Sequence, residues 1–129
     1  MIQRTKGAQS LAFAEAPCII SSASVVGKKE SEGPLGELFD MAGEDDLFGE
    51  RTWEEAESRI QKEACVLALG KAHLTPDRVR CLYGGDLLRQ GIATSMGAEE
   101  LQIPLFGLFG ACSTSGEALA LAAMSAAAG

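Results

Sequence analysis

The sequence predicts an α/β fold in which strands and helices alternate in the order βαβαβα around a mostly parallel sheet. Apolar runs with the length and composition of buried strands occur at residues 18–26, 79–83 and 105–111. Each run is followed by a segment with helical spacing, at residues 52–72, 92–101 and 113–128. Alternation of this kind is typical of a parallel sheet with right-handed crossovers.

The first expected strand lies between Pro17 and Gly27 and has β-branched residues at both of its ends. The segment before it, residues 1–16, contains only a short apolar stretch interrupted by Glu15, so it does not form a signal peptide. We expect residues 1–16 to be poorly ordered and residues 17–129 to form the folded unit. A long charged excursion follows the strand, with one helical turn expected at residues 35–39.

The first long helix has a clear start and a clear end. Thr52 and Glu55 have the spacing of a capping box, in which both side chains satisfy free amides at a helix start. Apolar residues then recur every three or four positions and predict one buried face: Trp53, Ala56, Ile60, Ala64, Leu67 and Ala68. Pro76 cannot continue the helix, which we expect to end near Ala72.

The second half of the chain is more apolar than the first. The short strand 79–83 ends at Gly84-Gly85-Asp86, and the helix 92–101 ends before Pro104. The strand 105–111 is apolar on both faces, as a central parallel strand is when helices cover both sides. The helix 113–128 is apolar almost all round, so another half-domain or another subunit must cover it. We therefore expect an incomplete half-domain, with homodimer formation through the third strand and the last helix.

Composition excludes several functions. The net charge of −7 does not favour nucleic acid or anionic lipid as a partner. The four cysteines are widely spread and the chain has one histidine, so neither a zinc site nor any other metal site is expected, and apolar neighbours around the thiols indicate an intracellular protein. The apolar stretch near residue 129 is too short to span a membrane, and no phosphate-binding loop or other cofactor motif is present.

Cys112 is the first candidate for chemistry, because it lies where an apolar strand turns into an apolar helix. Amides at a helix start stabilise negative charge, so a thiol at this point is expected to have a lowered pKa and to react as a thiolate. Gly110 and Ala111 are small enough for a ligand to approach the backbone, and Ser113 could cap the helix. A cysteine at such a junction can also be a simple core residue.

Several motifs in register resemble the stage V sporulation protein AD family, whose fold is thiolase-like. The stretch from Phe109 to Thr114 is similar to the nucleophile turn of the thiolase superfamily. Four other stretches carry the narrower resemblance: Ser24 to Glu30, Gly33 to Asp40, Thr52 to Glu57 and Gly85 to Gln90. The resemblance covers about residues 17–125 and corresponds to the amino-terminal portion of that family.

The resemblance implies a protein that binds dipicolinic acid, or its calcium chelate, for uptake into the developing spore. It implies a location peripheral to the spore inner membrane, reached through membrane-embedded sporulation uptake proteins as partners. Cys112 matches the nucleophile position and would line the ligand pocket, with Gly110, Ala111 and Ser113 as its backbone frame. Asp86 and Gln90 follow the carboxyl end of a strand, where open α/β sheets bind ligands; loop aspartates also serve as caps.

Three functions remain open on sequence grounds. The first is a binding protein for a small aromatic dicarboxylate, which needs a pocket but no acid–base relay. The second is a thiolase or ketoacyl synthase that uses Cys112 as nucleophile and helix-start amides as oxyanion hole. The third is a unit that acts only in dimerisation or folding. Because a second catalytic half is absent from these residues, we expect no enzymatic activity.

Overall fold

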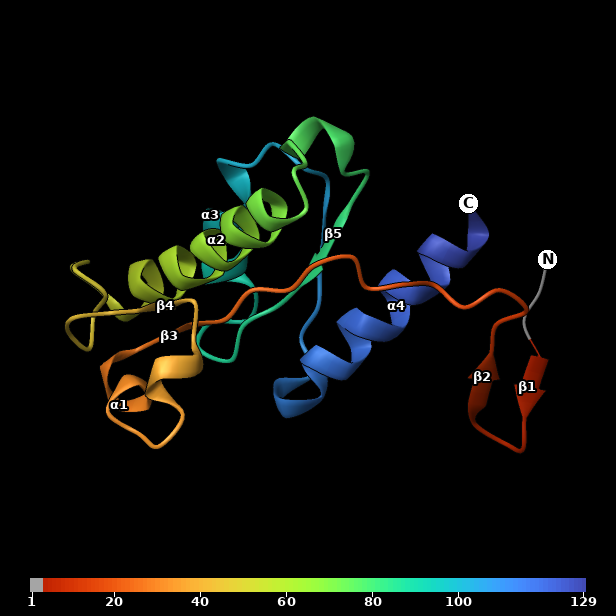
Figure 1. Cartoon of the computed structure of the whole chain (residues 1–129), viewed down its shortest axis with the longest axis horizontal. Coiled ribbons are helices and arrows are strands. Elements are labelled where there is room, and N and C mark those ends of the chain that lie inside the picture. The colour runs from red at the N-terminus through yellow and green to blue at the C-terminus, as the bar shows by residue number, and fades with distance from the viewer. Residues whose placement is uncertain (1–3) are drawn as a thin grey trace.

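The computed structural model describes residues 4–129, which form three separate pairs of short strands and several helices (Figure 1). The strands are β1 (Arg4–Lys6), β2 (Ser10–Ala12), β3 (Val25–Val26), β4 (Met41–Ala42), β5 (Leu82–Gly84) and β6 (Leu105–Gly107). The α-helices are α1 (Lys28–Ser31), α2 (Trp53–Lys71), α3 (Ile92–Glu99) and α4 (Thr114–Ala128). Three short 3-10 turns are η1 (Gly36–Leu38), η2 (Pro76–Arg78) and η3 (Ala111–Ser113).

The two pairs β3–β4 and β5–β6 are both parallel, which confirms the α/β class and the parallel strand direction. The single continuous sheet that we predicted does not form within residues 4–129. The first strand pairs instead with β4, which lies inside the charged excursion. Asp40 fixes this pairing, because its carboxylate accepts a hydrogen bond from the Ser24 amide at 2.8 Å and another from Lys71 Nζ at 2.6 Å.

The strand predicted at residues 18–26 is reduced to Val25 and Val26. The residues before it run in an extended path across α2 and β5 (Figure 1), and no strand in the described part of the chain pairs with them. Ser21 Oγ donates to the Ala68 carbonyl at 2.7 Å, so part of this path is attached to α2. The side chains of Ile19 and Ile20 are exposed.

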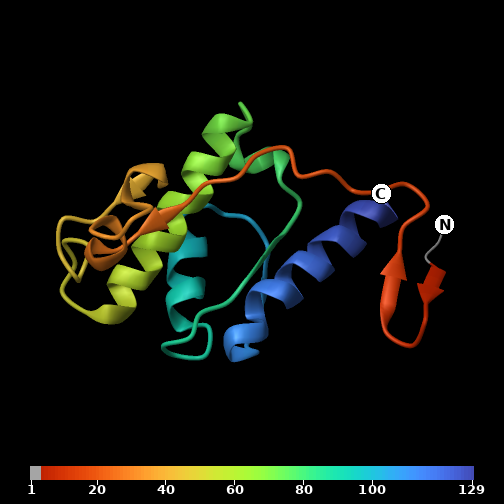
Figure 2. The same cartoon turned by 60° about the horizontal axis from the view of Figure 1, so that its bottom comes forward.

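An antiparallel hairpin of β1 and β2 precedes this path and lies away from α2 and α3 in both views (Figures 1 and 2). No strand was predicted within residues 4–12. The hairpin pairs Arg4 with Ala12 and Lys6 with Ser10.

Helix α2 has the boundaries that the sequence predicted. Thr52 Oγ1 accepts from the Glu55 amide at 3.2 Å, and the Glu55 carboxylate accepts from the Thr52 amide at 3.1 Å, so the capping box is formed. Trp53, which the spacing placed on the buried face, is instead exposed.

The core lies between α2 and α3 and consists of small or medium side chains. A Cβ atom on Gly97 would lie 2.7 Å from the Ser58 carbonyl oxygen, so the glycine permits the close approach of the two helices. The buried apolar residues are Ala56, Ala93, Ala98, Leu101 and Ile103.

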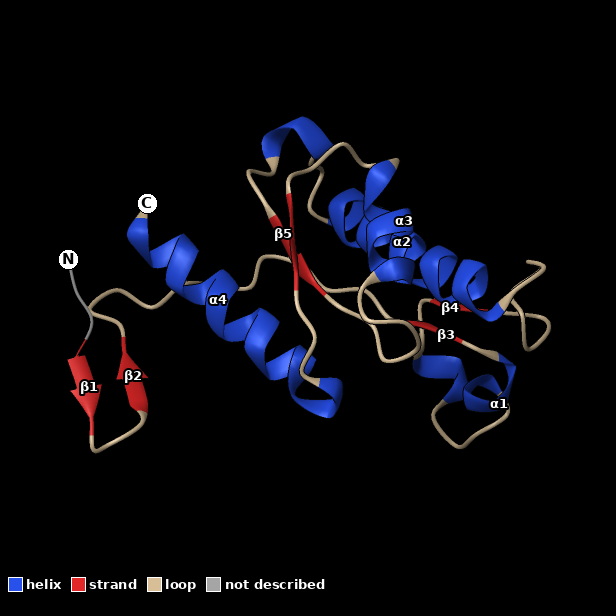
Figure 3. Ribbon diagram, turned by 180° about the vertical axis from the view of Figure 1, so that it is seen from behind, coloured by secondary structure: helices blue, strands red, loops and turns tan. Residues whose placement is uncertain are grey.

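Helix α4 follows β6 and runs diagonally across the molecule, with its end near the hairpin (Figures 1 and 3). It is held by contacts with β5, including a hydrogen bond between the hydroxyl groups of Tyr83 and Ser125. Most of its side chains are exposed, as are Phe106 and Phe109 beside it, so residues 4–129 do not cover the third strand on both faces.

The total accessible surface agrees with an incomplete enclosure. It is 9050 Å², whereas a compact monomer of this mass would expose about 6,500 Å². The apolar helix and strand of the second half account for part of this excess.

Candidate functional site

The turn between β6 and α4 carries Cys112 and is held against the end of β5. The Leu108 amide donates to the Gly84 carbonyl at 2.8 Å, which extends the β5–β6 pairing by one residue. A Cβ atom on Gly85 would lie 2.1 Å from the Leu108 carbonyl oxygen and 2.6 Å from Thr114 Cγ2. Only glycine therefore permits this close contact between the two segments.

Side chains from the first turns of α4 fold back onto the strand-to-helix turn. The Gly110 amide donates to Thr114 Oγ1 at 3.0 Å, and Thr114 is buried. Ser113 Oγ lies 2.7 Å from the Gly110 carbonyl oxygen and 2.5 Å from Glu117 Oε1, so its hydroxyl can donate to either. Thr114 and Glu117 are thus part of this site, and the sequence did not mark Glu117 for it.

Ala111 has a backbone angle φ of 50°, a left-handed conformation that is uncommon for a residue with a Cβ atom. Such positions cluster at ligand sites and active sites, where surrounding contacts hold them in place. Here two hydrogen bonds hold the backbone around Ala111: the Gly110 amide donates to Thr114 Oγ1, and the Ser113 amide donates to the Gly110 carbonyl at 3.0 Å.

Cys112 lies in η3, directly after this left-handed residue and before the first residue of α4. Its side chain is exposed in this chain. Gly110, Ala111, Cys112 and Ser113 thus form the turn between strand and helix that the sequence predicted, and the thiol of Cys112 lies at the surface. His73, the one histidine of the chain, lies just beyond the carboxyl end of α2.

Asp86 is close to this turn in the fold, but its carboxylate faces α3. The residue is 3% exposed. Its Oδ1 accepts from the amides of Arg89 and Gly91 at 3.1 and 3.0 Å, and its Oδ2 accepts from Thr94, from the amide at 3.0 Å and from the hydroxyl at 2.9 Å. All four contacts lie within the protein, so the carboxylate acts as a cap for α3.

The pKa of Asp86 reflects these contacts. Burial by itself would raise this pKa, but the hydrogen bonds from Gly91, Thr94 and Arg89 together lower it below the ordinary value of an aspartate. Gln90, the other residue predicted in this loop, is exposed and has a left-handed φ of 55°.

Glu57 is a second carboxyl group beside this loop, and it lies outside the buried face that the sequence predicted for α2. Its Oε2 atom is buried and has no hydrogen-bond partner within the described residues. Burial raises the pKa of Glu57 most, the negative charge of Asp86 adds to this, and the amides of Leu87 and Leu88 oppose it. The sequence around Glu57, which lies between the apolar positions 56 and 60, contains no pattern that predicts an inward-facing carboxyl group.

The acidic run at residues 44–46 does not converge on a site. Asp45 Oδ1 accepts from the amides of Leu47 and Gly49 at 2.8 and 3.1 Å, so it stabilises its own turn. Within residues 4–129, no three His, Cys, Asp or Glu side chains lie together as metal ligands would. Over the same residues, no helix combines the length and apolarity that crossing a bilayer requires.

The fold and the site define an α/β protein with a cysteine in a constrained strand-to-helix turn. Comparison with known proteins gives the family: the chain belongs to the stage V sporulation protein AD family, whose model matches residues 7–129. It is 41% identical over 117 residues to Stage V sporulation protein AD of Bacillus subtilis (strain 168). The aligned region covers 90% of this chain and 34% of that relative, so the chain spans about a third of the relative's length.

Proposed function

We propose that this chain acts in sporulation as part of a protein that binds dipicolinic acid, or its calcium chelate, for uptake into the developing spore. The observation that carries the proposal is the family membership over residues 7–129, with a relative that is itself a stage V sporulation protein. The binding role itself rests on the resemblance described above, and the β6–α4 turn offers a place for the ligand.

The turn supports a binding role through its backbone. Gly110 and Ala111 present little side-chain bulk, and the left-handed Ala111 sets the direction of the peptide groups around Cys112. The exposed hydroxyl of Ser113 can donate a hydrogen bond to a carboxylate if it leaves its present partners. These are few polar groups on a small surface, which is what orientation of a small ligand requires.

The proposal includes a second half-domain or a second copy of the chain that covers α4. The exposed apolar surface of α4, together with Phe106 and Phe109, would be one wall of the ligand pocket, and a thiolase-like second half-domain or a second copy of the chain would be the other. Contact with membrane-embedded sporulation proteins would place the protein at the periphery of the spore inner membrane.

An acyl-transfer enzyme is the second candidate, because the thiol of Cys112 is accessible and follows a residue held in a rare backbone conformation. Such an enzyme forms a thioester on the nucleophile and releases the acyl carrier's thiol. It also needs a general base near the sulfur, and His73 lies on a different element.

An NMR titration of the isotopically labelled chain tests the proposal. Dipicolinate should shift the amide signals of residues 108–117, and binding should be weak because one wall is missing. Isophthalate, which has the same two carboxylates but no ring nitrogen, is the matched control ligand. Unchanged signals in residues 108–117 at millimolar dipicolinate would count against the proposal.

Mass spectrometry after incubation with an acyl-CoA tests the enzyme. An adduct on Cys112 that is absent from Cys112→Ala and retained in Cys18→Ala would favour acyl transfer. Cys18 is the control because its thiol is also exposed but lies outside the turn.

A further inference from the structure

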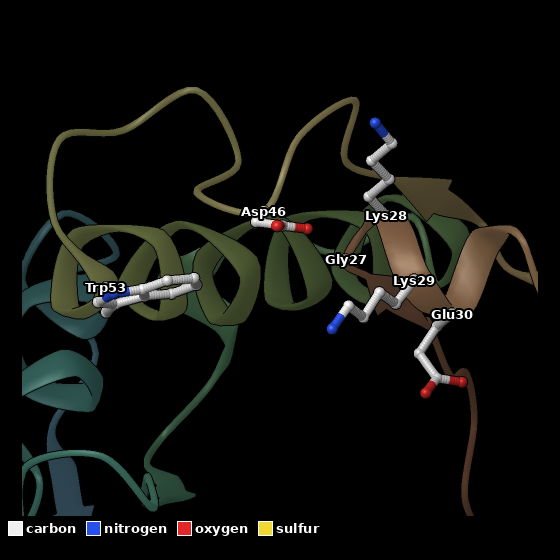
Figure 4. Close-up of a pocket in the computed structure, with 6 residues that line it drawn as sticks. All are labelled: Gly27, Lys28, Lys29, Glu30, Asp46 and Trp53. Carbon is white, nitrogen blue, oxygen red and sulfur yellow. The ribbon is translucent and has the colours of Figure 1, made fainter.

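A shallow recess lies between α1, the loop after β4 and the first residue of α2, and it shares no residue with the β6–α4 turn (Figure 4). Its volume is about 250 Å³. We call it the Lys29–Trp53 recess, and its lining residues are Gly27, Lys28, Lys29, Glu30, Asp46 and Trp53.

Trp53 gives the recess a flat apolar wall. The residue is 58% exposed although it is the first residue of α2, and it lines the recess. Aromatic rings stack on such a face with their planes offset, and cations also lie over it. It is the one tryptophan of the chain.

The charged groups around the recess have no ion-pair partner within residues 4–129. Several cations elsewhere on the surface are paired, for example Lys71 with Asp40 at 2.6 Å and Arg89 with Glu54 at 3.3 Å. The recess has two lysines and two acidic residues, so its formal charge is zero. A simple anion or a simple cation therefore gains little from the net field.

Two opposite charges of the recess, Lys29 and Asp46, come from different segments. Figure 4 shows the Lys29 side chain extending from α1 toward the side on which Trp53 lies, whereas Lys28 and Glu30 extend away. Asp46 lies on the loop before α2, across from Lys29 and above the level of the Trp53 ring in this view. A cation from α1 and an anion from the loop before α2 thus lie on the side of the recess that faces Trp53.

We propose that the Lys29–Trp53 recess binds a small aromatic zwitterion, which is a planar ring that carries one carboxylate and one protonated amine. The ring packs on the indole of Trp53, the carboxylate pairs with Lys29, and the ammonium pairs with Asp46. The volume suits this ligand, because a cavity of about 150 Å³ holds benzene and the remainder accommodates two small substituents. Because the recess is open to water, the affinity is in the millimolar range.

The probe for the test is 4-(aminomethyl)benzoate, and the readout is the fluorescence of Trp53 in the whole chain. Benzoate and benzylamine, which each carry one of the two charges, are the matched control ligands. We expect a saturable change in emission with the zwitterion and a markedly weaker effect with either control.

Two variants locate the contacts. Lys29→Gln and Asp46→Asn should each weaken binding about fivefold, which is the effect of losing one exposed charge pair. Lys28→Gln, which removes a neighbouring charge that extends away, should change the affinity less than about twofold. Far-UV circular dichroism confirms that each variant keeps its helices.

Three results would overturn the proposal. The first is no saturable change in emission with the zwitterion. The second is equal binding of benzoate or benzylamine, which would exclude recognition of both charges. The third is binding that Lys29→Gln leaves intact, which would place the ligand elsewhere.

Discussion

Asp86 should contribute more to folding stability than any other single carboxylate within residues 4–129. Its side chain is 3% exposed and accepts four hydrogen bonds, three from backbone amides and one from a hydroxyl. A hydrogen bond to a charged group contributes about 1.5–3 kcal/mol, but contacts that share one carboxylate are not additive. We therefore expect Asp86→Ala to lower the free energy of unfolding by about 3 kcal/mol.

Urea unfolding followed by far-UV circular dichroism measures this loss. With a slope of about 1.5 kcal/mol per M, the midpoint would fall by about 2 M. Asp77→Ala is the control, because Asp77 is exposed and its variant should stay within about 0.5 kcal/mol of wild type. An Asp86→Ala midpoint equal to that of the control would refute the capping role.

The pH dependence gives a second check on the same residue. The pKa of Asp86 is lower in the folded chain than in the unfolded chain, so its stabilising contribution is present above the ordinary aspartate pKa. That contribution is lost as the pH falls through the lowered folded value. Asp86→Ala should therefore differ most from wild type at neutral pH and least in strong acid.

Three other predictions concern neighbouring groups. Gly85→Ala should destabilise the chain by about 2 kcal/mol in urea unfolding, because the added methyl would meet the Leu108 carbonyl oxygen, a backbone atom that cannot move away; a neutral effect would contradict this contact. Alkylation followed by mass spectrometry should modify Cys112 early and Cys65 last, since burial raises the pKa of the Cys65 thiol; reversal of this order would contradict the described exposures. Glu57→Gln should not destabilise the chain at neutral pH and should weaken the dependence of its folding stability on pH. Burial raises the pKa of Glu57, so the favourable contribution of this residue is lost as the pH rises through the raised pKa. A large loss of stability at neutral pH would show that the carboxylate form is needed.

Local signals in the sequence predicted local structure well. The pair Thr52 and Glu55 located the start of α2 to the residue, because a capping box involves only neighbours along the chain. The glycines around Cys112 likewise located the strand-to-helix turn. The capping box spans three residues, and the hydrogen bonds inside the turn, Gly110 with Thr114 and Ser113 with Glu117, each span four.

Structure that depends on contacts between residues far apart in the chain could not be predicted from local sequence patterns. The partner of β3 is set by Asp40, whose contacts with Ser24 and Lys71 span 16 and 31 residues. Glu57 points inward because the β5–α3 loop presents amides to it. The neighbouring residues of α2 do not indicate where that loop lies. The sequence left two roles open for Asp86, ligand binding and helix capping. Only the positions of the amides around its carboxylate distinguish these roles.

The alanine at position 111 has a consequence for precision at the turn. Glycine would adopt a φ of 50° without steric cost, whereas alanine pays about 1 kcal/mol for it. In exchange, the methyl group removes most of the alternative backbone directions that a glycine would sample. The backbone that carries Cys112 is therefore more rigid than it would be after a glycine, so the Cα–Cβ bond of the cysteine keeps a more constant direction.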